Sequence, residues 1–221
     1  MSCSKIKNKS VSINSYSYKE EKLNIISHAI GVLFSIFALA LLTTKGIKSG
    51  NITHIFAYSI YGLSLLTVFS ASTLYHSAKS PVSRKKFKVF DHIAIYLSIA
   101  GTYTPYALIT LNDSNVGTII IVLVWSIAIT GIIFKLFFTG RFKIVSTLSY
   151  LAMGWSIVIA VKPLIENVEM NGLVWLAVGG ILYTTGAIIY QIKKIKFNHA
   201  IFHFMVLIAA ISHVIAVYYY I

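Results

Sequence analysis

Long apolar segments follow one another along almost the whole chain, with only short polar stretches between them. About 20 apolar residues are enough for a helix to cross the hydrocarbon core of a bilayer, and a helix satisfies its backbone hydrogen bonds internally. We count seven such segments, at about residues 24–44, 53–77, 90–111, 116–138, 144–164, 171–191 and 199–220. The sequence therefore predicts an all-α integral membrane protein, a bundle of seven transmembrane helices.

The composition agrees with a protein embedded in lipid. Hydrophobic residues make up 57% of the 221 residues and charged residues 11%, whereas an average soluble domain has about 25% charged residues. This excludes a disordered protein and argues against a soluble globule. The single cysteine, Cys3, can form neither an intramolecular disulfide nor a cysteine-based metal site. Any metal must therefore be held by His, Asp or Glu.

Two regions are expected along the chain. Residues 1–22 are polar and basic and lack the apolar core of a signal peptide, so we expect a cytoplasmic tail there. Residues 23–221 form the seven-helix transmembrane domain.

The Lys and Arg residues gather in alternate loops, and cytoplasmic loops are the ones that hold a positive excess. With seven spans, three of the 19 basic residues, Lys45, Lys48 and Lys162, fall on one side and all others fall on the opposite side. This distribution predicts a multi-pass plasma-membrane protein with its amino terminus in the cytoplasm and its carboxyl terminus outside. It also explains the net charge of +13 by topology and anionic lipids. Membrane lipids rather than nucleic acid are the expected partners, and an oligomer is left open.

Ionisable side chains inside a membrane are costly and usually functional. In the predicted topology a set of polar residues falls at one level near the cytoplasmic side: His28, Ser72, His76, Asp91, His92, His199 and His203. Residues four apart share a helix face, so the imidazoles of His199 and His203 can converge on one ion. Together with His76 they would fill three positions of a tetrahedral zinc site and leave the fourth to water. We therefore predict a Zn²⁺ site at these three histidines.

Two further residues suit catalysis at such a site. Asp91 would accept a proton from the metal-bound water or hold that water, and Ser72, one turn before His76, would orient it or stabilise an oxyanion. Each assignment has an alternative. A single histidine in a membrane helix more often bonds a neighbouring helix than a metal, and Asp91 would equally serve as a helix anchor, in an ion pair with Lys88 or Arg84.

His213 is too far along its helix to join the same metal shell. It lies ten residues beyond His203, or about 15 Å at 1.5 Å per residue. Ten residues still bring it to the interior side of the helix, so we expect it to line a cavity.

These residues, taken in order, resemble the hemolysin III family, the bacterial branch of the progestin and adipoQ receptor superfamily that includes the adiponectin receptors. The resemblance covers nearly the whole chain. It rests on Glu21-x-x-Asn24-x-x-Ser27-His28-x-x-Gly31, Ser72-x-x-x-His76, Phe90-Asp91-His92, Gly101-Thr-Tyr-Thr-Pro105 and His199-x-x-x-His203 followed by His213. It implies a seven-helix bundle with zinc at the positions of His76, His199 and His203, and with Ser72 and Asp91 near the metal-bound water.

The resemblance leaves two classes of function open. The relation to receptors implies a lipid amide hydrolase of the ceramidase type, whereas the family name implies cytolysis through pores. A pore former should carry a polar stripe along several helices, and the fourth to sixth segments have almost no ionisable residue. We therefore expect a zinc-dependent lipid hydrolase, with a non-enzymatic pore former or a membrane-state sensor holding a structural zinc as the alternative.

The topology yields the first testable prediction. A reporter enzyme that is active only outside the cytoplasm should be active when it is fused after Ile221, because seven crossings place this end outside. A cytoplasmic reporter that is active at the same position would contradict the predicted orientation.

Overall fold

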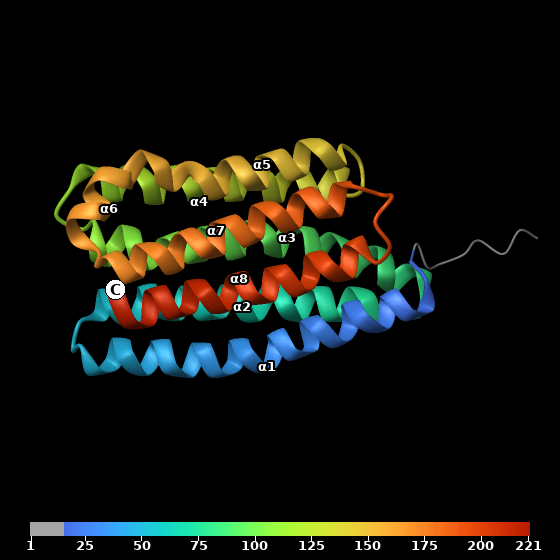
Figure 1. Cartoon of the computed structure of the whole chain (residues 1–221), viewed down its shortest axis with the longest axis horizontal. Coiled ribbons are helices and arrows are strands. Elements are labelled where there is room, and N and C mark those ends of the chain that lie inside the picture. The colour runs from blue at the N-terminus through green and yellow to red at the C-terminus, as the bar shows by residue number, and fades with distance from the viewer. Residues whose placement is uncertain (1–15) are drawn as a thin grey trace, which may run out of the picture.

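The structure, a computed structural model, describes residues 16–221, so Cys3 and most of the expected basic tail lie outside the described residues. The described part is helical throughout, without strands (Figure 1). Its elements are α1 (Tyr18–Lys48), α2 (Ile52–Ser77), α3 (Pro81–Pro105), the π-helix η1 (Tyr106–Thr110), α4 (Asn115–Phe138), α5 (Lys143–Trp155), the 3-10 helix η2 (Ser156–Ala160), α6 (Val161–Asn167), α7 (Met170–Gln191) and α8 (Asn198–Tyr220).

Seven helical segments of the described chain are long and apolar enough to cross a membrane, which confirms the predicted seven-helix architecture. Five are single helices. The third span joins α3 and η1, and the fifth runs from α5 through η2 to the end of α6. The outward faces carry exposed apolar side chains such as Ile129, Leu148 and Val174, which are suited to contact with lipid tails.

Two helices begin earlier than the apolar segments indicate. α1 starts at Tyr18 because Ser17 caps it: the Glu20 backbone N–H donates to Ser17 Oγ at 3.3 Å, and the acidic residues of the first turn suit a helix amino terminus. α3 starts with Pro81, a residue tolerated in the first turn because no backbone donor is needed there. Glu21 and Arg84 consequently lie inside helices.

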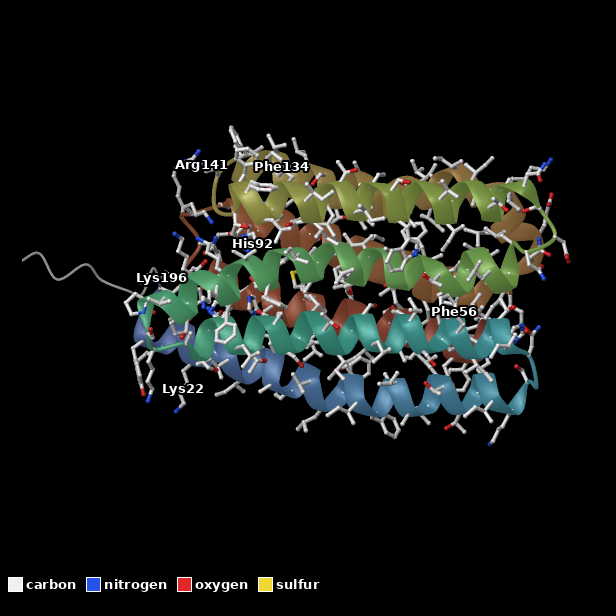
Figure 2. All side chains as sticks on the ribbon, turned by 180° about the vertical axis from the view of Figure 1, so that it is seen from behind. Lys22, Phe56, His92, Phe134, Arg141 and Lys196 are labelled. Atoms are coloured by element: carbon white, nitrogen blue, oxygen red, sulfur yellow. The ribbon has the colours of Figure 1, made fainter. Side chains whose placement is uncertain are left out.

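The helices run side by side along the long axis of the bundle (Figure 1). α2 packs between α1 and α3, and α8 contacts both α1 and α7. The start of α1 and the carboxyl terminus lie at opposite ends of the bundle, as an odd number of spans requires. Figure 2 shows Lys22, Arg141 and Lys196 at the end where α1 starts, and we call this the basic end.

A cavity of about 1200 Å³ extends along the inside of the bundle. Its lining reaches from Asp91 at the basic end to Met170 at the opposite end and includes His213, which confirms the cavity-lining position predicted for that histidine. Val158 and Ile181 line the cavity and are also exposed on the outer surface. The cavity therefore borders the lipid-facing surface between η2 and α7.

Candidate metal centre

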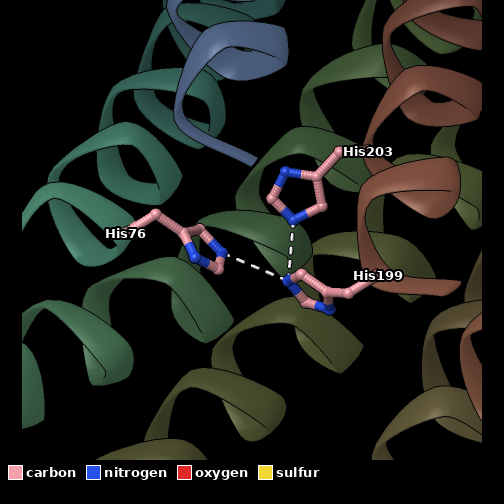
Figure 3. A group of neighbouring side chains, drawn as sticks. All are labelled: His76, His199 and His203. Atoms are coloured by element: carbon pink, nitrogen blue, oxygen red, sulfur yellow. Dashed lines mark hydrogen bonds between the residues drawn. The ribbon is translucent and has the colours of Figure 1, made fainter. Parts of the chain in front are cut away.

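Three histidines meet at the basic end of the bundle, from helices that are far apart in the sequence. His76 lies in the last turn of α2, whereas His199 and His203 occupy the first two turns of α8 (Figure 3). The start of α8 is fixed to the end of α7, because the Asn198 side-chain amide donates to the backbone oxygen of Tyr190 at 2.7 Å. The structure thus brings together the three residues that the sequence analysis selected as zinc ligands.

The three imidazoles converge through their Nε2 atoms. The Nε2 of His199 lies 3.1 Å from that of His76 and 2.8 Å from that of His203, and the three side chains are buried, with 3%, 7% and 2% of His76, His199 and His203 exposed. Zinc–nitrogen bonds of about 2.0–2.1 Å in a tetrahedral site place two nitrogen ligands about 3.3 Å apart. The two distances are a few tenths of an ångström shorter than this, and the ligand atoms of all three residues lie within 4.8 Å of one another, so this group could hold a metal ion.

A carboxylate sets the orientation of His76. Its Nδ1–H donates to Glu21 Oε2 at 2.6 Å, so the Nε2 lone pair is available to a metal. A carboxylate behind a metal-binding histidine fixes the ring tautomer and raises the basicity of the ligand. Glu21 would therefore act on a metal bound there through His76.

The same carboxylate is held by an arginine. Arg84 of α3 donates to Glu21 Oε1, and both side chains are 8% exposed. The guanidinium also lies 4.9 Å from the centre of the Tyr75 ring. These contacts join α1, α2 and α3 behind His76. The sequence analysis left open an ion pair of Asp91 with Lys88 or Arg84. In the structure Arg84 pairs with Glu21.

Tyr16 covers the other side of the centre. Its ring stacks on His199 with centroids 4.5 Å apart, and His199 Nδ1 lies 3.3 Å from the tyrosine hydroxyl. Burial raises the pKa of Tyr16 above its usual value, so the hydroxyl is neutral. It can accept a hydrogen bond from His199 when this imidazole carries its proton on Nδ1. This contact leaves Nε2 of His199 directed at the other two histidines.

Ser72 lies one turn before His76 on α2 and Asp91 lies on α3, and neither is part of the group of three ligands. Ser72 is 1% exposed, and its hydroxyl lines the cavity without a hydrogen-bond partner among the described residues. Asp91 also lines the cavity, and its Oδ2 lies 3.7 Å from Nδ1 of His92. Their predicted catalytic roles stay predictions.

His28 is a fourth buried imidazole beside the centre, to which the sequence analysis gave no role. Its ring stacks on that of His203 with centroids 3.7 Å apart, and neither ring nitrogen has a hydrogen-bond partner among the described residues. Glu21 was missed as well, because it was placed before the first span. One signal links them: Glu21, Asn24 and His28 follow a spacing of three and four residues, which places them on one helix face.

Comparisons with known proteins find matches over most of the chain. The family described as "Haemolysin-III related" matches residues 16–214. The chain is similar to Hemolysin-3 of Bacillus cereus, at 48% identity over 86% of each chain, and to the Hemolysin-3 homolog of Bacillus subtilis strain 168, at 45% identity over 87% of this chain and 90% of that protein. It is also similar to the human Monocyte to macrophage differentiation factor, at 29% identity over 91% of this chain and 84% of that protein.

The buried Glu21–Arg84 pair yields the second prediction. Glu21→Ala should lower the free energy of unfolding by about 3–5 kcal/mol, because it leaves a buried guanidinium without a counter-charge. Adding Arg84→Ala should recover part of the loss. Chemical unfolding in detergent measures both effects, with Lys22→Ala, the exposed neighbour, as the control. Equal stability of the Glu21→Ala and Lys22→Ala proteins would contradict the role of the pair.

Proposed function

The chain belongs to the haemolysin-III-related family and is a multi-pass protein of the cell membrane, and on that premise we propose that it is a zinc-dependent hydrolase of lipid amides, similar to a ceramidase. The observation that carries the proposal is the meeting of three buried imidazoles close to a large cavity inside the membrane domain. Zinc bound by three histidines with an open fourth position is the usual form of a catalytic zinc site.

The donor set favours zinc as the metal. Imidazole nitrogens suit zinc, whereas calcium and magnesium prefer oxygen ligands. Glu21 and Tyr16 hold the outer nitrogens of His76 and His199, which is the usual environment of zinc-binding histidines. A zinc ion bound there would supply Lewis acidity toward a water molecule and an acyl carbonyl.

The remaining chemistry falls to two residues of this chain. Hydrolysis adds water across the amide C–N bond, so that the acyl carbon gains the oxygen and the nitrogen leaves as an amine. Asp91, whose carboxylate lines the cavity, would accept the proton of the water and deliver it to the leaving nitrogen. Ser72, whose buried hydroxyl has no hydrogen-bond partner among the described residues, would donate to the carbonyl oxygen as negative charge develops there.

The cavity favours a lipid substrate. Its volume of about 1200 Å³ exceeds the range of about 300–1000 Å³ typical of sites for drug-sized ligands. Leu164, Leu173 and Leu176 line it toward the end opposite His76, His199 and His203, as an acyl chain requires. Because the cavity borders the lipid-facing surface at Val158 and Ile181, a lipid would enter sideways from the bilayer.

We also propose the orientation of the protein in the membrane. The turns after α2, α4 and α7 lie with the three histidines at the basic end (Figure 2), and the excess of Lys and Arg at this end favours the cytoplasmic side. The amide C–N bond of the substrate would then be cleaved near the cytoplasmic leaflet. Residues 1–22 would form the cytoplasmic tail, with its last residues already in α1.

Cytolysis is the second candidate, because two relatives carry the name hemolysin. A channel through one chain would need polar side chains along its length, and the cavity lining toward the opposite end is instead largely apolar, with Ile165, Met170 and Leu173. A pore would therefore require several copies. A membrane-state sensor with a structural zinc is the further non-enzymatic alternative, and absence of hydrolysis on every lipid amide and ester tested would favour these alternatives.

Metal content gives the third prediction. Purified protein should hold about one zinc per chain, and His199→Ala with His203→Ala should abolish zinc binding, because two of three ligands are lost. His54→Ala, at the opposite end of the bundle, should leave the zinc content unchanged. Elemental analysis of the detergent-purified proteins measures the zinc content per chain. An unchanged zinc content in the double variant would show that His199 and His203 contribute to helix packing and do not bind the metal.

The role of Asp91 gives the fourth prediction. Asp91→Asn should keep the fold and most of the zinc, since no ligand is lost, while lipid-amide hydrolysis falls by about 10²-fold or more, the scale of a positioned general base. If Asp91 instead anchors α3 through Lys88, the same change should lower the melting temperature, and Lys88→Ala should reproduce that loss. Full hydrolysis by the Asp91→Asn protein would remove this residue from the mechanism.

A further inference from the structure

The cavity carries a second set of charged side chains, apart from the histidines. Basic residues from α3, α4 and the turns that follow α4 and α7 line it at the basic end: Lys88, Lys135, Arg141, Lys193 and Lys196. The described acids that line the cavity are Glu20 and Asp91. The lining therefore has a clear excess of positive charge.

Lys135 differs from the basic residues that are solvated at a membrane surface. Lysines that follow the positive-inside pattern extend toward the lipid headgroups and water, whereas Lys135 is 1% exposed and lines the cavity. Its ammonium donates to Ser146 Oγ and lies 6.0 Å from the centre of the Tyr150 ring. Neither of these contacts supplies a negative charge, although a buried ammonium is costly without one.

A second lysine, Lys88 of α3, lines the same cavity. A Cβ atom placed on Gly140, in the turn between α4 and α5, would stand 3.4 Å from Nζ of Lys88, so Lys88 of α3 reaches that turn. Arg141 follows Gly140 directly and also lines the cavity. Lys88, Lys135 and Arg141 thus line one cavity from α3, α4 and the α4–α5 turn, a set of cations that suits a multiply charged anion.

We propose that this end of the cavity binds the phosphate of a single-chain phospholipid whose acyl chain occupies the apolar part of the cavity. The continuity of the basic lining with Leu173 and Leu176 in one cavity favours an amphiphile over free phosphate. The inference rests on the proposed function in one respect, because it specifies that the lipid substrate of the hydrolase carries an anionic phosphate. Binding itself requires neither zinc nor hydrolysis.

The test is equilibrium binding of radiolabelled 1-oleoyl lysophosphatidic acid to the full-length protein in a neutral detergent. We expect it to bind at least tenfold more tightly than 1-oleoyl lysophosphatidylcholine, which has the same chain and no net charge. Lys135→Met should abolish this preference, whereas Lys135→Arg should keep it, which separates loss of charge from misfolding. Lys86→Met is the matched control, because Lys86 is exposed at the same end and does not line the cavity.

Three results would overturn the proposal. They are equal affinity for the two lipids, an equal loss of preference in the Lys86→Met protein, and displacement of the labelled lipid by inorganic phosphate at the same low concentration as by unlabelled lipid. The His199→Ala, His203→Ala protein separates this proposal from the hydrolase. The lipid preference should persist there without zinc, and should persist in the wild-type protein even if no hydrolysis is found.

Discussion

Three imidazoles that share one buried point impose the strongest constraint on this protein. Their Nε2 atoms lie as close as 2.8 Å, all three side chains are buried, and a neutral imidazole offers only one donor and one acceptor. A metal ion accepts all three lone pairs at once. Such binding requires the end of α2 to lie beside the start of α8. Contacts with α7 and α1 hold α8 in that position.

The charges around the centre follow from its position. Glu21 orients His76, and Arg84 supplies the counter-charge to this buried carboxylate. The cavity begins at this polar cluster and continues into apolar lining. Such a cavity can hold the polar part of a lipid near the histidines and its chain within the bundle. The fold, the candidate metal centre and the cavity are therefore all consistent with the proposed hydrolysis of a lipid amide inside the membrane.

The seven spans were predictable because hydrophobic length alone specifies a transmembrane helix. The spacing of His199 and His203 likewise predicts a shared helix face. The role of Glu21 was not predictable in the same way, because hydropathy places the start of the first span after it, whereas capping by Ser17 extends the helix to include it. The burial of Lys135 was also missed, since a lysine at the end of a span is usually explained by snorkelling.

X-ray absorption at the zinc K edge of the purified, zinc-loaded protein would show whether His76, His199 and His203 bind the ion. We expect a four-coordinate ion with three imidazole nitrogens at about 2.0–2.1 Å and one further oxygen ligand. A spectrum with oxygen ligands only, or with a single imidazole, would contradict it, because His76, His199 and His203 would then meet for packing alone.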